Sequence, residues 1–307
     1  MTRVSSFGHQ QVMLNSLLDN QSRVFKDQTQ ITTGKKVETY SGLTSETTTL
    51  LGAKTVLDQT GGFLRASDNV KRGLSTNDIQ LESVVKNAQN VRDTMLQAIA
   101  QEQTFALRDL LNESYTSIVN ALNTSIGGVH IFGGARTDVE PVVGKNLTDL
   151  AAAPAVSNLF QNDQRHPSAK VGQNTVMEYG LLADQIGKDV FQVFKNIEAY
   201  DASASGPLSG KLNATQISYL KGELANMDKA IEKLRVLVAR NGTRQSNLDG
   251  IIKQHNGQEA YLKVFISDIE DVDVAGAITR MNNDQVALQA SYKITSQLGS
   301  LSLLKYL

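Results

Sequence analysis

The placement of proline restricts this chain more than any other feature of its sequence. All four prolines lie in one central window: Pro141, Pro154, Pro167 and Pro207. Residues 1–140 and 208–307 contain none. Proline inside a helix costs roughly 3 kcal/mol, because it lacks a backbone donor and clashes with the preceding turn. Two long proline-free arms around a proline-bearing centre therefore predict two helical arms and an irregular middle.

Both ends of the chain carry apolar residues at heptad spacing, which keeps one face of a helix turned toward a partner helix. In the N-terminal arm one column contains Leu17, Val24 and Ile31, and a second contains Phe7, Leu14, Leu18 and Phe25. In the C-terminal arm one column contains Val274, Met281 and Leu288, and its companion contains Ile278, Gln285 and Tyr292, continued by Leu298 and Leu301. Neither arm can bury its stripe alone, so the simplest arrangement pairs the two ends as a coiled coil.

The stretches next to these arms indicate a break and further helices. Residues 33–48 hold two glycines and many hydroxyl side chains, which predicts a break after the first helix. Apolar residues recur at helical spacing from about Leu50, and another helix is predicted over about 105–126. Thr215 and Asp273 are the predicted N-caps of the last two helices.

The segment over residues 129–182 changes character. Paired glycines flank a β-prone run in "GGVHIFGG", and turn residues separate short strand candidates at 139–143, 155–160, 168–172 and 175–182. We expect a small β-rich insert here, after which the helical pattern resumes near Ile186.

Composition and charge exclude several classes of function. The formal net charge is −1, so no basic excess exists that would neutralise the phosphates of a nucleic acid. No apolar run of about 18 residues is present, so we expect no membrane span. The N-terminus also lacks the apolar core of a cleavable secretory signal. The absence of cysteine excludes disulfides and thiolate metal ligands.

None of the polar clusters has the spacing of a catalytic or metal site. The histidines are scattered over the chain, at His9, His130, His166 and His255. None of them belongs to an H-E-x-x-H or i, i+4 metal pair. The acidic cluster of Glu270, Asp271 and Asp273 lacks the calcium-loop pattern, and we expect it to consist of helix-start acids. Gly128 and Gly133 have the spacing of a phosphate loop without its lysine. We therefore expect no enzyme activity, no cofactor and no metal.

Both ends of the chain resemble the flagellin superfamily. The segment Ser267–Leu307 opens with "SDIEDVD", continues through "LQASY" and closes with "LSLLKYL", similar to the C-terminal segment of that superfamily. The start, "RVSSF" followed by "MLNSLLDNQSRVFKDQTQITTGKKV", is similar to its N-terminal segment. The opening, the closing run and "IFGG" look more like the hook–filament junction proteins (hook-associated protein 3) than the filament flagellins.

This resemblance implies a mechanical role. It implies a structural protein of the bacterial flagellum that joins hook to filament by polymerisation of its terminal helices, with a filament flagellin or flagellin-like surface protein as the alternative. Residues 1–40 and 268–307 would be terminal helical polymerisation arms. Residues 41–128 and 183–267 would form a helical bundle domain, and 129–182 a small β-rich outer insert.

The resemblance also implies assembly residues, partners and a location. Subunit assembly is expected at Phe7, Leu14, Leu17, Val24, Ile31, Val274, Ile278, Met281, Leu288, Leu298, Leu301, Leu304 and Leu307. The implied partners are further copies of the chain in a ring or tube, other hook-associated proteins, flagellin, and an export chaperone at the C-terminal helix. The implied location is the extracellular flagellum, reached by type III export without a cleaved signal peptide.

Two other roles are weighed for particular segments. "QNVRDTMLQ" is similar to the flagellin stretch that the innate receptor TLR5 recognises, with Gln89, Arg92 and Gln97 as the candidate residues. Asn90 and Thr94 depart from that pattern, so weakened recognition is expected, and a packing surface between subunits is the alternative. In a different class of function, a secreted helical effector or ligand-binding module would use the insert, with Tyr179, Phe160 and His166 as its site.

Overall fold

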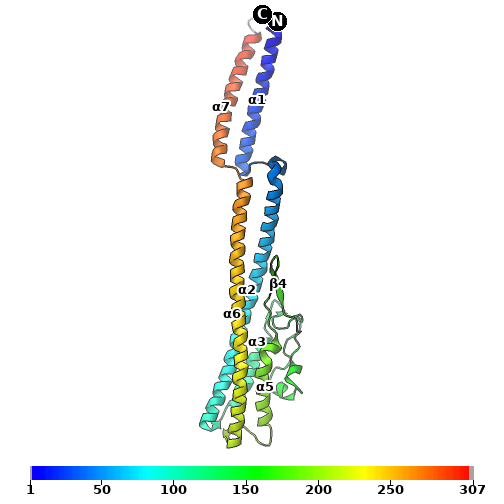
Figure 1. Ribbon diagram of the computed structural model, residues 1–307, viewed down its shortest axis with the longest axis vertical. Helices are drawn as coiled ribbons and strands as arrows, with labels where there is room; N and C mark the ends of the chain where they lie inside the picture. The colour runs from blue at the N-terminus through cyan, green and yellow to red at the C-terminus, as the bar shows by residue number, and fades with distance from the viewer. Residues whose placement is uncertain (1, 304–307) are drawn as a thin grey trace. The chain divides into compact units, whose positions relative to one another are not determined.

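The computed structural model describes the backbone of residues 2–303, and their side chains except those of residues 2–7, 9, 10, 44, 45 and 298–303. Its elements in chain order are α1 (Thr2–Thr33), η1 (Tyr40–Glu46), α2 (Thr47–Gln101), β1 (Gln103–Thr104), α3 (Leu107–Leu122), β2 (Ser125–Ile126), β3 (Val129–His130), α4 (Leu147–Ala152), η2 (Val156–Leu159), β4 (Ser168–Gly172), β5 (Thr175–Glu178), α5 (Ala183–Asp201), β6 (Gly210–Lys211), α6 (Ala214–Glu270) and α7 (Val274–Leu303). The elements η1 and η2 are 3-10 helices. The prediction of a mainly α fold with long antiparallel helices is confirmed (Figure 1).

The chain forms two compact units. The terminal unit consists of residues 1–59 and 258–307, and the central unit consists of residues 60–257. The long helices α2 and α6 each contribute residues to both units. The proline-free arms of the sequence supply these long helices, since nothing in them interrupts the backbone ladder.

In the terminal unit, α1 and α7 pack against each other in antiparallel directions (Figure 1). A hydrogen bond joins Asn20 to Ser291, and a backbone bridge joins Lys35 to Asp271. The predicted pairing of the two chain ends is thereby confirmed. The 3-10 helix η1 and the parts of α2 and α6 in this unit share a small core made of Leu43, Leu50, Ala53, Leu262 and Ile266.

The core of the central unit lies between α2, α3, α5 and α6. Its large, fully buried side chains include Tyr115, Phe132, Phe191 and Phe194. The rings of Tyr115 and Phe191 lie 4.7 Å apart, and the Tyr115 hydroxyl donates to the Gly144 carbonyl at 3.1 Å. Each aromatic ring buries on the order of 150–250 Å², so this cluster supplies much of the unit's stability.

The insert contains less strand than the sequence predicts. Two of the four strand candidates form the antiparallel hairpin of β4 and β5. The candidates at 139–143 and 155–160 are wrong, because they meet only in a bridge between Val142 and Phe160, and η2 occupies most of the second. Irregular backbone buries their apolar side chains, Val142 and Val156 among them. The apolar pattern of these two segments therefore reflects burial in the core and not the pairing of strands.

The predicted helix caps are partly right. Asn213, rather than Thr215, caps α6: the backbone N–H of Gln216 donates to Asn213 Oδ1 at 2.8 Å. The backbone N–H of Asn213 donates to Gln216 Oε1 at 2.9 Å, which completes a capping box. Thr215 lies within the first turn. Asp273 caps α7 as predicted, because its Oδ1 accepts from the Ala275 backbone N–H at 3.1 Å.

Candidate functional site

The pairing of α1 with α7 defines an inner seam of residues at alternating spacings of four and three. On α1 these residues are Met13, Leu17, Asn20, Val24, Asp27 and Ile31, and on α7 they are Ala277, Met281, Asp284, Leu288 and Ser291. All of them are buried or half-buried in the terminal unit. Among the predicted assembly residues, Leu17, Val24, Ile31, Met281 and Leu288 thus lie in the inner seam.

Polar contacts cross the inner seam at two levels. In the first polar layer, Asn20 Nδ2 donates to Ser291 Oγ at 3.0 Å. Arg23 donates to Asn20 Oδ1, and its Nε lies 3.4 Å from Asp284 Oδ1. The Asn20 residue is only 5% exposed, so its amide needs these partners.

The second polar layer lies seven residues further along α1. Asp27 is 6% exposed, and its Oδ1 lies 3.5 Å from Arg280 Nε. Arg280 also donates through Nη2 to Gln30 Oε1 at 3.3 Å. A carboxylate this buried is stabilised by the guanidinium that faces it, since an unpaired buried charge is costly.

A second set of apolar residues on α1 and α7 remains exposed although the two helices are paired. We call them the outer apolar residues: Val12, Leu14, Leu18, Phe25, Val274, Ile278, Val286, Tyr292 and Ile294. Their exposed fractions range from 41% for Ile278 to 70% for Phe25. The predicted assembly residues Leu14, Val274 and Ile278 belong to this set. Several large exposed apolar side chains on one pair of helices are typical of an interaction surface.

The predicted assembly residues nearest the chain ends cannot be placed in this way. Phe7, Leu298 and Leu301 lie in α1 and α7, but their side chains are outside the described part of the chain. Leu304 and Leu307 lie outside the described residues altogether.

A charged cluster holds the segment that follows α1 against the end of α6. Lys35 Nζ lies 3.1 Å from Glu270 Oε2 and 2.6 Å from Asp271 Oδ1, and Lys54 also pairs with Glu270. Ser267 donates to Asp271 Oδ2. Backbone hydrogen bonds from Lys36 to Glu270 and from Val272 to Gly34 reinforce the cluster. We call Lys35, Lys54, Ser267, Glu270 and Asp271 the clasp.

Opposite charges shift the pKa values within the clasp. The pKa of Asp271 is lowered by hydrogen bonds from Lys35 and Ser267. Burial alone would raise the pKa of Glu270, but hydrogen bonds from Lys54 and Lys35 outweigh it and lower the pKa. The pKa values of Lys35 and Lys54 are raised by the hydrogen bonds to these carboxylates. All four groups are therefore charged near neutral pH.

The clasp corrects one expectation from the sequence. Glu270 and Asp271 were expected to be helix-start acids, but α6 ends at Glu270 and both carboxylates bind lysines. Only Asp273 of the acidic cluster begins a helix. Among the described residues, no group of His, Asp and Glu side chains is arranged to hold a metal ion.

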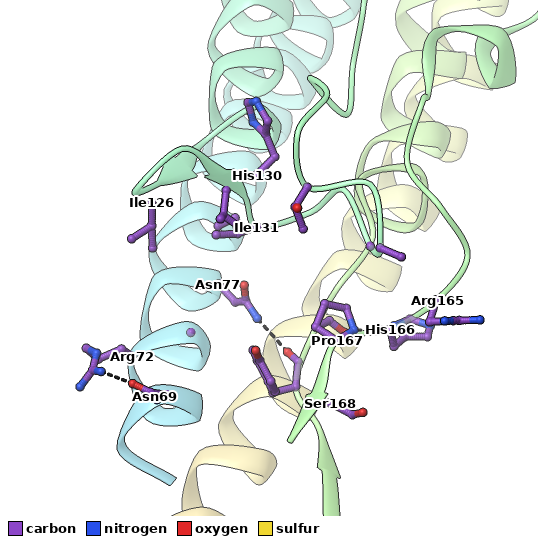
Figure 2. A pocket seen from close by; sticks show the side chains of 17 residues that line it. Asn69, Arg72, Asn77, Ile126, His130, Ile131, Arg165, His166, Pro167 and Ser168 are labelled. Carbon is purple, nitrogen blue, oxygen red and sulfur yellow. Dashed lines mark hydrogen bonds between the residues drawn. The ribbon is translucent and has the colours of Figure 1, made fainter. Parts of the chain in front are cut away.

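A groove of about 470 Å³ lies in the central unit, between α2 and the segments that follow α3. Figure 2 shows the side chains that line it. His166 and Tyr179 line it as the ligand-binding alternative expects, whereas Phe160 stacks on Phe191 at 5.8 Å in the core. His166 Nδ1 hydrogen-bonds to the Gly180 carbonyl, and Asn77 donates to the Tyr179 carbonyl at 2.9 Å. The first bond closes the insert on itself, and the second fastens the insert to α2.

The glycines of "IFGG" have a structural explanation. A Cβ on Gly133 would lie 2.3 Å from the Arg136 carbonyl oxygen. Gly134 has a φ of +67°, a conformation that side-chain-bearing residues rarely adopt. The pair is therefore required by the tight backbone path at the start of the insert.

The segment with the predicted receptor similarity lies on α2. Arg92 Nε lies 2.6 Å from Asp228 Oδ1, and Arg92 Nη1 lies 2.9 Å from Asp93 Oδ1. Gln89 is half-buried and Gln97 is exposed. The Arg92 guanidinium is thus occupied within the chain, and receptor recognition stays a prediction.

Comparison with known families matches the two arms of the chain. Residues 4–137 match the model of the bacterial flagellin N-terminal helical region, and residues 224–307 match that of the bacterial flagellin C-terminal helical region. The chain belongs to the flagellin superfamily. The matches include all of α1 and α7 within the described residues except residues 2 and 3 of α1. A search of curated proteins gives no match.

Solved structures share this fold at low sequence identity. A protein from Vibrio parahaemolyticus that is described as a flagellar hook-associated protein is 18% identical to this chain, with a TM-score of 0.59. The match covers 72% of this chain and 96% of that one. FlgL from Xanthomonas campestris is 15% identical with a TM-score of 0.57, over 70% and 99%. FlgL from Bacillus cereus is 14% identical with a TM-score of 0.53, over 71% and 99%.

No described helix combines the length and apolarity that crossing a membrane requires.

The apolar heptad columns of the sequence do not predict the polar layers of the inner seam. Asn20 and Asp27 each follow a predicted seam residue, Leu17 and Val24, by three positions. A coiled-coil seam uses spacings of three and four in turn. Alternating steps of three and four residues from Leu17 and Val24, applied to polar as well as apolar residues, predict that Asn20 and Asp27 lie in the seam.

Proposed function

We propose that this chain is a structural protein of the bacterial flagellum that joins hook to filament, and that its terminal unit assembles with further copies of itself. The observation that carries the proposal is the exposure of the outer apolar residues after α1 and α7 have paired. An intramolecular core would bury its largest apolar side chains first, yet Phe25 and Leu18 stay 70% and 52% exposed. A contact with other copies would remove this surface from water.

A concave feature lies beside these residues. A groove of about 370 Å³ runs along Phe25, with Lys36 and Val37 on its other side. A side chain from the neighbouring copy would fill such a groove more readily than it would cover a flat surface. A head-to-tail contact of this kind, repeated on every copy, would generate a ring or a helical tube.

The hook–filament position rests on similarity. The structural relatives are named as hook-associated proteins and FlgL, and their likeness to this chain is one of fold. The opening "RVSSF" and the closing "LSLLKYL" add to this assignment, as the sequence analysis indicates. The other hook-associated proteins, flagellin and an export chaperone at α7 are the partners that go with it. Extracellular location through type III export also belongs to this proposal.

Two secondary points follow from the same assignment. A structural role accounts for the absence of any catalytic constellation in the sequence, so we propose no enzyme activity. Recognition of the Gln89–Gln97 segment by TLR5 would be weak, because Asp228 and Asp93 already occupy the Arg92 guanidinium.

The decisive experiment is deletion of the gene in the source bacterium, followed by electron microscopy of the cell surface. Cells with hooks and without filaments would support the junction role. A shortened or altered filament would instead favour the alternative of a filament flagellin. Gel electrophoresis of sheared flagella from wild-type cells distinguishes the same two roles. A junction protein would be a minor band, whereas a filament flagellin would be the dominant band.

A further inference from the structure

The inner seam of α1 and α7 is interrupted by polar side chains at regular intervals. The first polar layer pairs Asn20 with Ser291, and the second pairs Asp27 with Arg280, as described above. Apolar residues at these positions would give the helix pair a larger apolar contact. Polar residues in a coiled-coil seam lower stability but specify how the helices align.

Only the observed alignment satisfies both layers. A slip of one heptad would move α1 along α7 by about 10 Å, since each residue rises about 1.5 Å. Asp27 would then lose the Arg280 guanidinium, and Asn20 would lose Ser291. A buried carboxylate without a partner is strongly destabilising, so the slipped pair is disfavoured.

The polar layers also bear on pairing between identical helices. If α1 paired with α1 of a second copy in parallel, Asp27 would face Asp27. If α7 paired with α7 in the same way, Asp284 would face Asp284. Like charges at a desolvated seam repel, whereas the pairing of α1 with α7 places an arginine of the opposite helix beside each acid.

We propose that the two polar layers select the antiparallel register of α1 on α7 within one chain and oppose pairing of either helix with its own copy. The outer apolar residues are then left for contacts between chains. This assignment concerns pairing within one chain, and it holds or fails independently of the flagellar role.

Spin-label distances test the register directly. The chain contains no cysteine, so Ser22→Cys and Asn283→Cys, both exposed positions, place one label on each helix of the full-length protein. The distance is measured by electron paramagnetic resonance in free protein and in protein driven to assemble with ammonium sulfate. With the native seam we expect one narrow distance in at least one of these states.

Replacing the residues of the polar layers should broaden the distribution of distances between the two labels. The polar-layer variant carries four substitutions: Asn20→Leu, Asp27→Leu, Asp284→Leu and Ser291→Leu. We expect it to show a second population of label distances, which differs from the first by more than the rise of one helical turn, or to form dimers of free protein that ultracentrifugation detects. The variant Val24→Leu changes an apolar seam position and should keep the single distance. An unshifted single distance without dimers in the polar-layer variant would overturn the proposal, as would a broad distribution for the native seam in both states.

A charge exchange provides the second measurement. Asp27→Arg alone sets two guanidinium groups against each other and should broaden the distance distribution. Adding Arg280→Asp restores an ion pair in the same register and should recover the narrow distance. Failure of the double variant to improve on the single one would show that Asp27 and Arg280 do not act as a pair.

Discussion

Phe25 offers the sharpest test of assembly through the outer apolar residues. Its side chain is 70% exposed on α1, although α1 is already paired with α7. An aromatic side chain presents about 150–250 Å² of surface, so contact with a neighbouring copy would remove about 100–175 Å² from water. At about 25 cal/mol per Å² this corresponds to about 2.5–4 kcal/mol, before the cost of ordering the contact.

Phe25→Ser should therefore raise the critical concentration for polymerisation by about 60- to 700-fold before the ordering cost is subtracted, since each 1.4 kcal/mol is a factor of about ten. Sedimentation of polymer at a series of protein concentrations measures this value. Phe105→Ser is the matched control, because Phe105 is 80% exposed but lies between β1 and α3 in the central unit. If the two variants polymerise at the same concentration, Phe25 does not lie in a contact between copies.

Three further predictions concern the two units. Removing residues 294–307 should leave a soluble protein whose central unit melts at the native temperature by circular dichroism but which forms no polymer. Phe191→Ala should lower the free energy of unfolding of the central unit by about 3–5 kcal/mol in urea titration, because it empties a fully buried aromatic site. The lowered pKa of Glu270 makes its stabilising contribution complete above the ordinary value of 4.5, and this contribution is lost as the pH falls below it. When the pH is lowered below 5, the Glu270→Gln variant should therefore lose less stability than the native protein. Thermal melts at a series of pH values below 5 measure this difference, and an equal loss of stability in the two proteins would contradict this account of the clasp.

The sequence predicts the helical arms well because their signals are local and repeated. The heptad repeat of Leu17, Val24 and Ile31 indicates a helix and shows which of its faces packs against a partner. The absence of proline allows that helix to continue without a break. The pairing of the first helix with the last follows because each has a stripe that it cannot bury alone. Asp273 also caps α7 as its position predicts.

The insert and the clasp could not be derived in the same way. The apolar runs around Val142 and Val156 have the composition of strands, but the core of the central unit buries them without a strand ladder. Glu270 and Asp271 are acids next to a helix start in the sequence, yet their partners Lys35 and Lys54 are more than 200 residues away. Side chains brought together from such distances leave no local pattern.

The pairing of α1 with α7 has a consequence for the order in which the chain acquires its structure. Asn20 and Ser291, which meet in the first polar layer, are separated by 271 positions in the sequence. Closing so long a loop carries an entropic cost that must be met before the contact contributes, whereas the contacts within the central unit all join residues between 60 and 257. During synthesis, α1 leaves the ribosome well before α7 has been made. For that entire interval its seam has no intramolecular partner, and completion of the terminal unit is the final step.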